Sequence, residues 1–404
     1  MRTRTVKDVD CKGRRVLIRV DFNVPLAEDG SVLDDRRISA ALPTIQHVIA
    51  HGGIAILMSH FGRPAGTGPE PSCSLRPVAA RLRELVGSGQ NVNFVEGSCV
   101  GEAASAAIAG AQAGDIVLLD NLRFEAGEKS NDAAFGAALA TGVDAYVNDA
   151  FGTAHRAHAS MVAVPHAMAG APCAAGLLLE KEIHFLSDVL HNPTRPFVAV
   201  LGGAKVSDKL AAIENLLPKV DTVLVGGAMA YTFLHAQGGA IGESLLERGM
   251  VEVADRLLKE AAASDVELLL PTDHLCGTGI EAGGEVRTCE LGVPPGWMGL
   301  DIGPETVERW SSVLHKAKTI VWNGPVGVFE TPPFDTGTMA LARAAAEATK
   351  KHKAVTVVGG GETAAAVERA GLADAISHVS TGGGASLRML EGAELPGLAS
   401  LDRV

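Results

Sequence analysis

The chain has 404 residues, of which 47% are apolar and 20% are charged, and its 47 glycines indicate a globular protein with many tight turns. A chain of this length is too long to fold around one ordinary hydrophobic core, so we expect two compact domains. A formal net charge of -12 argues against nucleic acid or an anionic membrane as a partner bound through a broad basic surface.

Cysteine usage and the first residues indicate the compartment. The six cysteines form no Cys-x-x-Cys pair and no metal-ligand spacing, so we predict a reducing, cytoplasmic location. The opening MRTRTVKDVD lacks the apolar stretch of a signal peptide, so we expect no secretion. The uncharged run from Met161 to Leu179 is long enough to span a bilayer, but it contains Pro165, Gly170 and Pro172. We therefore interpret it as a buried loop and the start of a helix.

Short apolar runs rich in β-branched residues alternate with Ala- and Leu-rich helical stretches, which is typical of βα units and mostly parallel sheets. The first half contains predicted strands at Val16–Val20, Ile54–Met58, Val92–Val95, Ile116–Leu119 and Ala145–Val147. Those of the second half lie at Phe197–Leu201, Thr222–Val225, Val266–Leu270, Thr319–Trp322, Ala354–Val358 and Ile376–Val379. The predicted fold class is α/β, with two doubly wound, Rossmann-like domains.

The segment between the two series of strands predicts an interdomain helix. From Leu177 to Leu190, apolar residues recur at roughly helical spacing before the turn HNPTRP. We therefore expect an N-terminal domain over residues 1–175, a helical linker with a hinge over 176–194, and a C-terminal domain over 195–387.

Polar and glycine-rich segments follow the predicted strands. In chain order they read DFN, SHFGR, NLRF and NDAFGTAHR in the first half, and GGAK, GGAM, NGPVG, GGGET and STGGG in the second. Loops and helix N-termini converge at the carboxyl ends of parallel strands. These segments therefore predict two ligand surfaces, one rich in Arg and His and the other rich in Gly.

Arginine is the most informative residue type of the first surface. Four arginines on separate loops are suited to bind a small multiply charged anion such as a phosphorylated acid, although any one alone is better explained as a solvated surface residue. They are Arg37, Arg63, Arg123 and Arg156, with Arg19 close behind and His60, His155 and His158 nearby. We interpret His155 and His158 as scaffold. Asp21 and Asn23 project on one side of a strand end, where they either accept hydrogen bonds from a substrate hydroxyl or form a turn.

The second surface is built from glycine runs and one lysine. Gly202, Gly203 and Lys205 follow a strand and open a helix, where glycines let backbone amides approach phosphate oxygens and the lysine supplies a charge. The sequence contains neither a Walker A loop nor a G-x-G-x-x-G dinucleotide fingerprint. Glu362, in GGGET, is either a Mg²⁺ ligand or an acid that favours the N-terminus of a helix.

Together these motifs resemble the phosphoglycerate kinase family over nearly the full length of the chain. The resemblance rests on RVDFNVP (19–25), SHFGRP (59–64), NLRF (121–124), YVNDAFGTAHRAH (146–158), LGGAKVSDK (201–209), WNGPVGVFE (322–330), GGGET (359–363) and STGGGASL (380–387). It implies that the first domain binds phosphoglycerate, that the second binds an adenine nucleotide, and that the C-terminal tail, residues 388–404, packs back on the first domain.

The resemblance also implies roles for individual residues. The phosphoglycerate site would consist of Asp21, Asn23, Arg37, His60, Arg63, Arg123 and Arg156. The nucleotide site would consist of Gly203, Ala204, Lys205, Lys209, Gly227, Gly299, Leu300, Asn323, Pro325, Glu330, Gly360, Gly361, Glu362 and Thr363. Arg37 and Lys205 match the catalytic cations that stabilise the transferring group, and Asp208 and Glu362 match positions linked to the metal, Mg²⁺.

The implied activity is reversible phosphoryl transfer between 1,3-bisphosphoglycerate and ADP, giving 3-phosphoglycerate and ATP, in line and after hinge closure. The resemblance to the family also implies that the protein is a monomer. The chain departs from the family pattern at Glu362, where Asp is usual, at Ala228, where Gly is frequent, and at Arg388, where an acid is frequent. The alternatives are a non-catalytic phosphometabolite-binding protein and a nicotinamide-dependent dehydrogenase, and the dehydrogenase requires the G-x-G-x-x-G turn that this sequence lacks.

Overall fold

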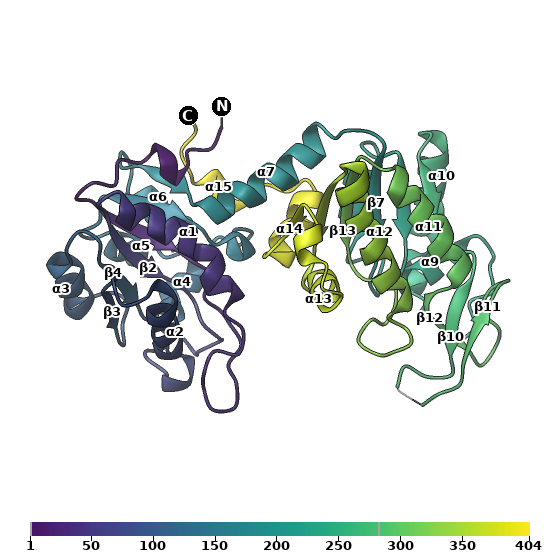
Figure 1. Cartoon of the computed structure of the whole chain (residues 1–404), viewed down its shortest axis with the longest axis horizontal. Helices are drawn as coiled ribbons and strands as arrows, with labels where there is room; N and C mark the ends of the chain where they lie inside the picture. The colour runs from purple at the N-terminus through teal and green to yellow at the C-terminus, as the bar shows by residue number, and fades with distance from the viewer. Residues whose placement is uncertain (1, 282) are drawn as a thin grey trace. The chain divides into compact units, whose positions relative to one another are not determined.

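The computed structural model describes residues 2–281 and 283–404, and the chain divides into two compact units (Figure 1). The first unit contains Met1–Ile183 and Glu394–Val404, and the second contains His184–Ala393. Each unit is built around a parallel sheet of six strands, which confirms the predicted α/β fold class. The end of the chain therefore belongs to the same unit as its beginning.

The sheet of the first unit has the strand order β3-β4-β2-β1-β5-β6, and all neighbouring strands run parallel. Its strands are β1 (Arg15–Arg19), β2 (Ile54–Met58), β3 (Val92–Val95), β4 (Ile116–Leu119), β5 (Ala145–Asn148) and β6 (Cys173–Ala175). Its helices are α1 (Arg36–Ala50), α2 (Arg76–Val86), α3 (Glu102–Gly110), α4 (Ala126–Ser130), α5 (Ala133–Leu139), α6 (Ala163–Ala167) and α15 (Pro396–Ala399). The order reverses direction between β1 and β5, so the loops after these strands flank a switch point, where α/β sheets bind ligands.

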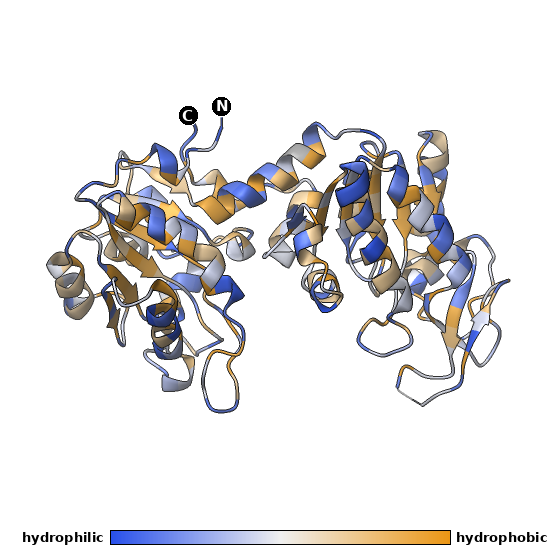
Figure 2. Cartoon of the chain, viewed as in Figure 1, coloured by the Kyte–Doolittle hydropathy of each residue, from blue (hydrophilic) through white to orange (hydrophobic). Residues whose placement is uncertain are grey.

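Both faces of this sheet are covered by helices. Val16 and Ile18 of β1 share a core with Ile45 of α1 and Leu82 of α2. Leu17, which points to the opposite face, is also fully buried. Parallel strands that are buried on both faces read as continuous apolar runs, and Figure 2 shows the apolar colour along the strands while the covering helices mix apolar and polar residues.

The second unit contains a parallel sheet with the order β15-β14-β13-β7-β8-β9 and an antiparallel sheet with the order β11-β10-β12. The parallel strands are β7 (Phe197–Leu201), β8 (Thr222–Val225), β9 (Glu267–Leu269), β13 (Thr319–Asn323), β14 (Val355–Gly359) and β15 (His378–Val379). The antiparallel strands are β10 (His274–Gly277), β11 (Val286–Cys289) and β12 (Met298–Ile302). The helices are α8 (Leu210–Leu216), α9 (Met229–Ala236), α10 (Val251–Ala263), α11 (Pro304–Lys316), α12 (Thr336–His352), α13 (Gly361–Arg369) and α14 (Gly383–Leu390).

Aromatic and aliphatic residues fill the core of the second unit. Trp322 of β13 packs with Trp310 of α11 and Leu341 of α12, and all three are fully buried. The predicted helix between the two series of strands is α7 (Leu177–His191), which begins in the first unit and ends in the second.

The structure adds strands that the sequence did not predict. Each predicted strand overlaps an observed one, but β6 and the three antiparallel strands were not expected. The sequence of β6, CAA, has little strand propensity, and β6 forms because it pairs with β5. The run from Met161 to Leu179, expected to be a loop and a helix start, also contains α6 and β6. Among the residues that the structure describes, no helix is long and apolar enough to cross a membrane.

Candidate active site

Basic side chains from several loops of the first unit surround a cavity of about 490 Å³. It is lined by Asn23, His60, Gly62, Arg63, Arg123, Lys129, Arg156 and His158. These residues follow β1, β2, β4 and β5, so the carboxyl ends of four parallel strands bring them together. We call these residues the basic cavity.

The turn at Gly62 links the loops that form the basic cavity. Asn23 Oδ1 accepts a hydrogen bond from Gly62 N (2.8 Å), and Arg123 Nη1 donates one to Gly62 O (2.6 Å). Gly62 has a φ angle of 58°, in the left-handed region that favours glycine. The turn therefore ties the loops after β1, β2 and β4 together and presents Arg63 directly after it.

Asp21 and Arg37 lie beside the basic cavity and do not line it. Arg37 Nη1 is 3.1 Å from Asp21 Oδ2 and 3.2 Å from the carbonyl oxygen of Asn23. Asp21 Oδ1 is 3.8 Å from His60 Nδ1. The carboxylate of Asp21 thus connects Arg37, at the start of α1, with the histidine that lines the cavity.

The basic cavity is strongly positive. Burial lowers the pKa of His60 well below its ordinary value, and the charges of Arg19, Arg123 and Arg156 lower it further, so its ring is neutral near pH 7. Burial also lowers the pKa of Arg123, and neighbouring arginines add to this effect. Within the described part of the chain, Arg123 and Arg156 make their polar contacts with a carbonyl oxygen and with the ring of His155, not with carboxylates. An anion bound here would relieve the repulsion among these cations.

Two buried charged residues, Glu128 and Arg19, contact the histidines that line the basic cavity. Glu128 is fully buried and accepts hydrogen bonds from the backbone and hydroxyl of Ser160 (2.9 and 2.7 Å), and His158 Nδ1 is 3.6 Å from it. Arg19, also fully buried, donates to Ser160 Oγ (2.9 Å) and contacts His60 Nδ1 (3.2 Å). Burial opposes ionisation of Glu128, but the hydrogen bond from His158 and the charge of Arg19 outweigh it and lower its pKa. His158 therefore lines the basic cavity and also contacts the buried Glu128.

A second cavity, of about 310 Å³, lies in the second unit and is mainly apolar and glycine-lined. Its lining consists of Gly203, Ala204, Gly227, Ala228, Leu245, Ile280, Met298, Gly299, Leu300, Pro325, Gly327, Val328, Glu330 and Glu362. We call this the glycine-lined pocket. Lys205, Asp208, Lys209, Asn323, Gly360, Gly361 and Thr363, which the resemblance also indicated, are not part of this lining.

Close backbone contacts explain two glycines of the glycine-lined pocket. A Cβ atom on Gly227, whose φ angle is 67°, would lie 2.6 Å from both the nitrogen and the oxygen of Gly203. A Cβ atom on Gly299 would lie 1.8 Å from the hydroxyl of Tyr231, which is buried behind β12. These positions leave the backbone of the pocket uncovered, as a planar or phosphorylated ligand requires.

Polar groups lie beside the glycine-lined pocket. Lys209 Nζ donates a hydrogen bond to Asn323 Oδ1, and the Thr363 hydroxyl accepts one from Gly324 N (2.7 Å). Burial lowers the pKa of Lys209, while the charges of Glu362 and Asp208 raise it. The ends of β13 and β14 and the loop after β7 therefore contribute cations and amides of the kind that bind phosphate.

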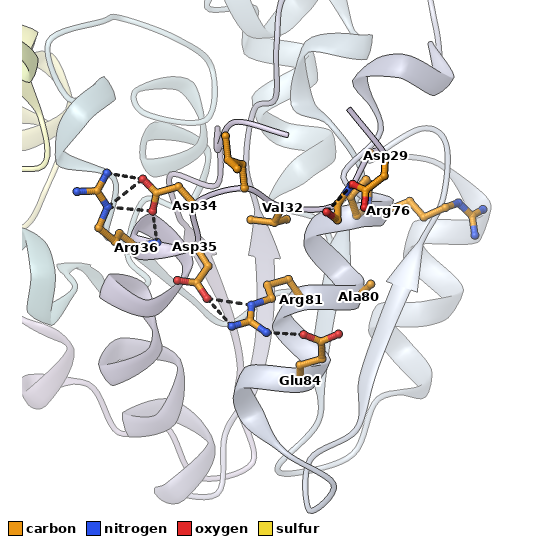
Figure 3. Close-up of a pocket in the computed structure, with 13 residues that line it drawn as sticks. Asp29, Val32, Asp34, Asp35, Arg36, Arg76, Ala80, Arg81 and Glu84 are labelled. Atoms are coloured by element: carbon orange, nitrogen blue, oxygen red, sulfur yellow. Dashed lines mark hydrogen bonds and ion pairs between the residues drawn. The ribbon is translucent and has the colours of Figure 1, made fainter. Parts of the chain in front are cut away.

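A larger cavity of about 770 Å³ in the first unit differs from the basic cavity because its arginines are neutralised (Figure 3). Arg81 Nε and Nη2 lie 2.9 and 2.7 Å from Asp35 Oδ2, and Arg36 Nε lies 2.9 Å from both carboxylate oxygens of Asp34. The contact of Arg81 anchors Asp35, the N-cap residue of α1, which lies two residues before Arg37 in the chain. This cavity therefore supports the start of α1 and presents little net positive charge.

The chain was compared with known proteins. Residues 6–393 match the family model described as phosphoglycerate kinase. A phosphoglycerate kinase of Chloroflexus aurantiacus is 51% identical over 402 residues, covering 99% of both chains, and one of Thermosipho africanus is 52% identical over 399 residues, covering 98% of this chain and 97% of the relative. The chain belongs to the phosphoglycerate kinase family.

Solved structures of phosphoglycerate kinases have the same fold. The structure of phosphoglycerate kinase from Coxiella burnetii has a TM-score of 0.89 and 38% identity, and covers 99% of this chain and 98% of that chain. Phosphoglycerate kinase from Pyrococcus horikoshii OT3 has a TM-score of 0.82 and 33% identity, with 98% of each chain covered.

Membership of the phosphoglycerate kinase family establishes the activity. The chain is an enzyme, a kinase that transfers a phosphoryl group between ATP and the carboxyl group of 3-phosphoglycerate. This confirms the predicted function, and neither the non-catalytic binding protein nor the dehydrogenase is favoured.

The residues around the glycine-lined pocket fit a magnesium ion bound chiefly by nucleotide phosphates. Among the described residues, no three or more His, Cys, Asp or Glu side chains group in a way that could hold a metal ion. Mg²⁺ on a nucleotide usually takes only one or two carboxylates and keeps several waters. Glu362 lines the pocket, whereas Asp208 does not. Two carboxylates, Glu330 and Glu362, line the pocket, and this number is consistent with the way kinases hold this ion.

The structure places several residues in the cavities that sequence reasoning missed. Lys129 lines the basic cavity, and Leu245, Ile280 and Met298 line the glycine-lined pocket. Leu245 and Ile280 are about half exposed, which is unusual for large apolar residues and suits the rim of a pocket. Lys129 had a weak signal, because it follows NLRF by five residues, but the apolar residues had none.

Proposed function

We propose that the basic cavity binds the phosphoglycerate and that the glycine-lined pocket binds the adenine nucleotide. The first unit would then be the phosphoglycerate-binding domain, predicted over residues 1–175 with the tail 388–404, and the second would be the nucleotide-binding domain, predicted over 195–387. The observation that carries this assignment is the contrast in charge. Arg63, Arg123 and Arg156 gather in one cavity without carboxylate partners among the described residues, whereas the other cavity is apolar and rich in glycine.

In this proposal, each group of residues has a distinct task. Asp21 and Asn23 accept hydrogen bonds from the substrate hydroxyl, and His60, Arg63, Arg123 and Arg156 bind its anionic groups. The base lies between the apolar residues of the glycine-lined pocket near Leu300, and Glu330 binds the ribose hydroxyls. Lys209, Asn323 and the residues Gly360, Gly361 and Thr363 contact the phosphates.

Phosphoryl transfer places few covalent demands on the protein, because catalysis depends on in-line positioning and on stabilising the charge of the transferring group. We assign that stabilisation to Arg37 and Lys205. Mg²⁺, held by Glu362 with Asp208 nearby, would neutralise charge on the nucleotide phosphates. A hinge in the linker 176–194 would close the domains and exclude water that would otherwise hydrolyse the acyl phosphate.

We further propose that the protein is a cytoplasmic monomer, because the sequence features and the family both favour this location and this oligomeric state.

Removing one arginine of the basic cavity tests the assignment of the two sites. Arg63→Ala and Arg156→Ala should each weaken 3-phosphoglycerate binding by about 10- to 100-fold, since a charge-assisted hydrogen bond contributes about 1.5 to 3 kcal/mol. ADP affinity should remain nearly unchanged. Calorimetric titration of each ligand measures both values.

Arg83→Ala is the matched control, because Arg83 is an exposed arginine of the same unit that bonds to the carbonyl oxygen of Val92. It should leave both affinities unchanged. If either cavity variant lost ADP and 3-phosphoglycerate affinity equally while remaining folded, the assignment of the sites would be wrong.

Glu362→Gln tests the carboxylate proposed for the metal. The amide keeps the size of the side chain but loses its charge, so the Mg²⁺ concentration needed for half-maximal activity should rise about tenfold. A magnesium titration of the steady-state rate at fixed ADP measures this. Glu330→Gln, in the same pocket, should leave the magnesium midpoint unchanged, and an unchanged midpoint for Glu362→Gln would remove that residue from the metal site.

A further inference from the structure

The loop after β5 (Asp149–Arg156), called here the β5 loop, ends at an arginine of the basic cavity. Two chain segments join the first unit to the second. One is α7, which leaves the first unit at Ile183, and the other is the segment that re-enters it at Glu394. Both segments are hydrogen-bonded to the β5 loop or to Asn148, the residue before it.

The outgoing connection, α7, has its first turn hydrogen-bonded to the carboxylate of Asp149. Asp149 Oδ1 accepts hydrogen bonds from Leu178 N (3.0 Å) and Leu179 N (3.1 Å), two amides of the first turn that have no partner inside the helix. The fit is close, because a Cβ atom on Gly176 would lie 2.2 Å from Asp149 Oδ1. Asp149 is fully buried and its own amide donates to the carbonyl oxygen of Arg19 (2.8 Å).

The returning connection is hydrogen-bonded to the same stretch of chain. Asn148 Nδ2 donates to the carbonyl oxygen of Gly397 (3.0 Å), and Gly397 N donates to the carbonyl oxygen of Ala154 (2.9 Å). A Cβ atom on Gly397 would lie 3.1 Å from Ala154 Cα, so α15 approaches the loop at backbone distance. The eight residues of the β5 loop therefore end at Arg156 and are hydrogen-bonded to both connections, to α7 through Asp149 and to α15 through Ala154.

We propose that the β5 loop couples ligand binding at Arg156 to both chain connections, and that Asp149 is the positioning residue for the α7 branch. The inference rests on the proposed phosphoglycerate site. A ligand that orders Arg156 reduces local opening of the loop, and the hydrogen-bonded partners of the loop then open less often as well. When Asp149 is ionised, its negative charge at the N-terminus of α7 strengthens its hold on the first turn.

The residues around Asp149 affect both the pKa of its carboxyl group and the amides that it binds. Burial raises the pKa of Asp149 to about 7, against the lowering effects of Thr44 and of the amides of Leu178 and Leu179. Thr44 Oγ1 itself accepts a hydrogen bond from Leu177 N (2.8 Å), so α1 and Asp149 hold consecutive amides of the same turn. Removing the carboxylate should therefore loosen this turn.

Hydrogen exchange of the full chain, with and without 3-phosphoglycerate alone, tests the coupling. In the unmodified protein, saturating ligand should slow amide exchange about threefold or more in residues 121–125 and 154–158, which report on the site, and in residues 177–183 and 395–401, which report on the connections. Asp149→Ala should abolish the ligand-induced slowing in 177–183 and preserve it in 121–125 and 395–401. Asn148→Ala should reduce the slowing in 395–401 and preserve it in 177–183, because it removes one of the two hydrogen bonds at Gly397 and leaves the bond from Gly397 N to the carbonyl oxygen of Ala154.

Asp120→Ala is the matched control, because Asp120 is another buried acid of this unit and accepts hydrogen bonds from Leu75 N (2.8 Å) and Ser74 Oγ (3.0 Å) at the start of α2. It should preserve the slowing in 177–183. If Asp149→Ala does not fold, Asp149→Asn replaces it and should reduce that slowing below the value of the unmodified protein.

The outcomes separate the two proposals. Slowing at the site without slowing in 177–183 of the unmodified protein would overturn the coupling, as would full slowing in 177–183 in both Asp149 variants. An absence of slowing in 121–125 and 154–158 would instead contradict the proposed phosphoglycerate site.

Discussion

Lys205→Ala is expected to lower kcat by about 100-fold or more while changing KM for ADP much less. Lys205 is exposed and directly follows Gly203 and Ala204, which line the glycine-lined pocket. An interaction made mainly in the transition state lowers kcat when it is removed, whereas one made equally with the bound substrate raises KM. Losing one preorganised stabilising donor has a cost of this size in other enzymes. Steady-state kinetics, with circular dichroism to confirm folding, measures the effect.

Two further variants sharpen this test. Lys205→Arg should restore only part of kcat, because a planar guanidinium cannot replace a compact ammonium at a crowded phosphate. Lys259→Ala serves as the control, since Lys259 is an exposed lysine of the same unit, paired with Asp255 on α10. A folded Lys205→Ala enzyme with a near-normal kcat and only a raised KM would refute the proposed role.

Gly227→Ala is expected to weaken ADP binding about tenfold or more. The residue has a φ angle of 67°, and an added Cβ atom would lie 2.6 Å from the backbone of Gly203. The left-handed conformation costs a non-glycine residue about 1 to 2 kcal/mol, and relieving the contact must displace Gly203, which lines the same pocket. Calorimetric titration with ADP, together with urea unfolding, separates the loss of affinity from the loss of stability.

Gly238→Ala is the matched control for this substitution. Gly238, after α9, has a similar φ angle of 81°, but an added Cβ atom would meet nothing within 4 Å. It should lower the free energy of unfolding by a comparable backbone cost while leaving ADP affinity unchanged. If both alanine variants bound ADP equally well, the close contact with Gly203 would not shape the pocket.

Local sequence determined the parallel sheets of this protein. The run Ile54–Met58 is apolar at every position because β2 is covered on both faces, and a continuous apolar run between turn signals is enough to predict such a strand. The same reasoning placed polar and glycine-rich segments at the carboxyl ends of the strands, where the basic cavity and the glycine-lined pocket lie. Family motifs then supplied the activity, which the comparisons confirm.

Only the tertiary structure decided which charged residues have partners. Arg81 is bound by Asp35, 46 positions away, whereas Arg63 lines a cavity of cations, and the residues next to Arg81 in the sequence do not indicate its partner. The antiparallel strands β10 to β12 and the rim residues Leu245 and Ile280 likewise gave no periodic signal.

The attachment of both chain connections to one loop shows the same limit most clearly. Asn148 and Gly397 are separated by 249 positions, and nothing near either residue indicates the other. Periodicity and propensity are properties of neighbours along the chain, whereas the partner of a buried polar group is set by whichever distant segment the packed core brings within hydrogen-bond distance.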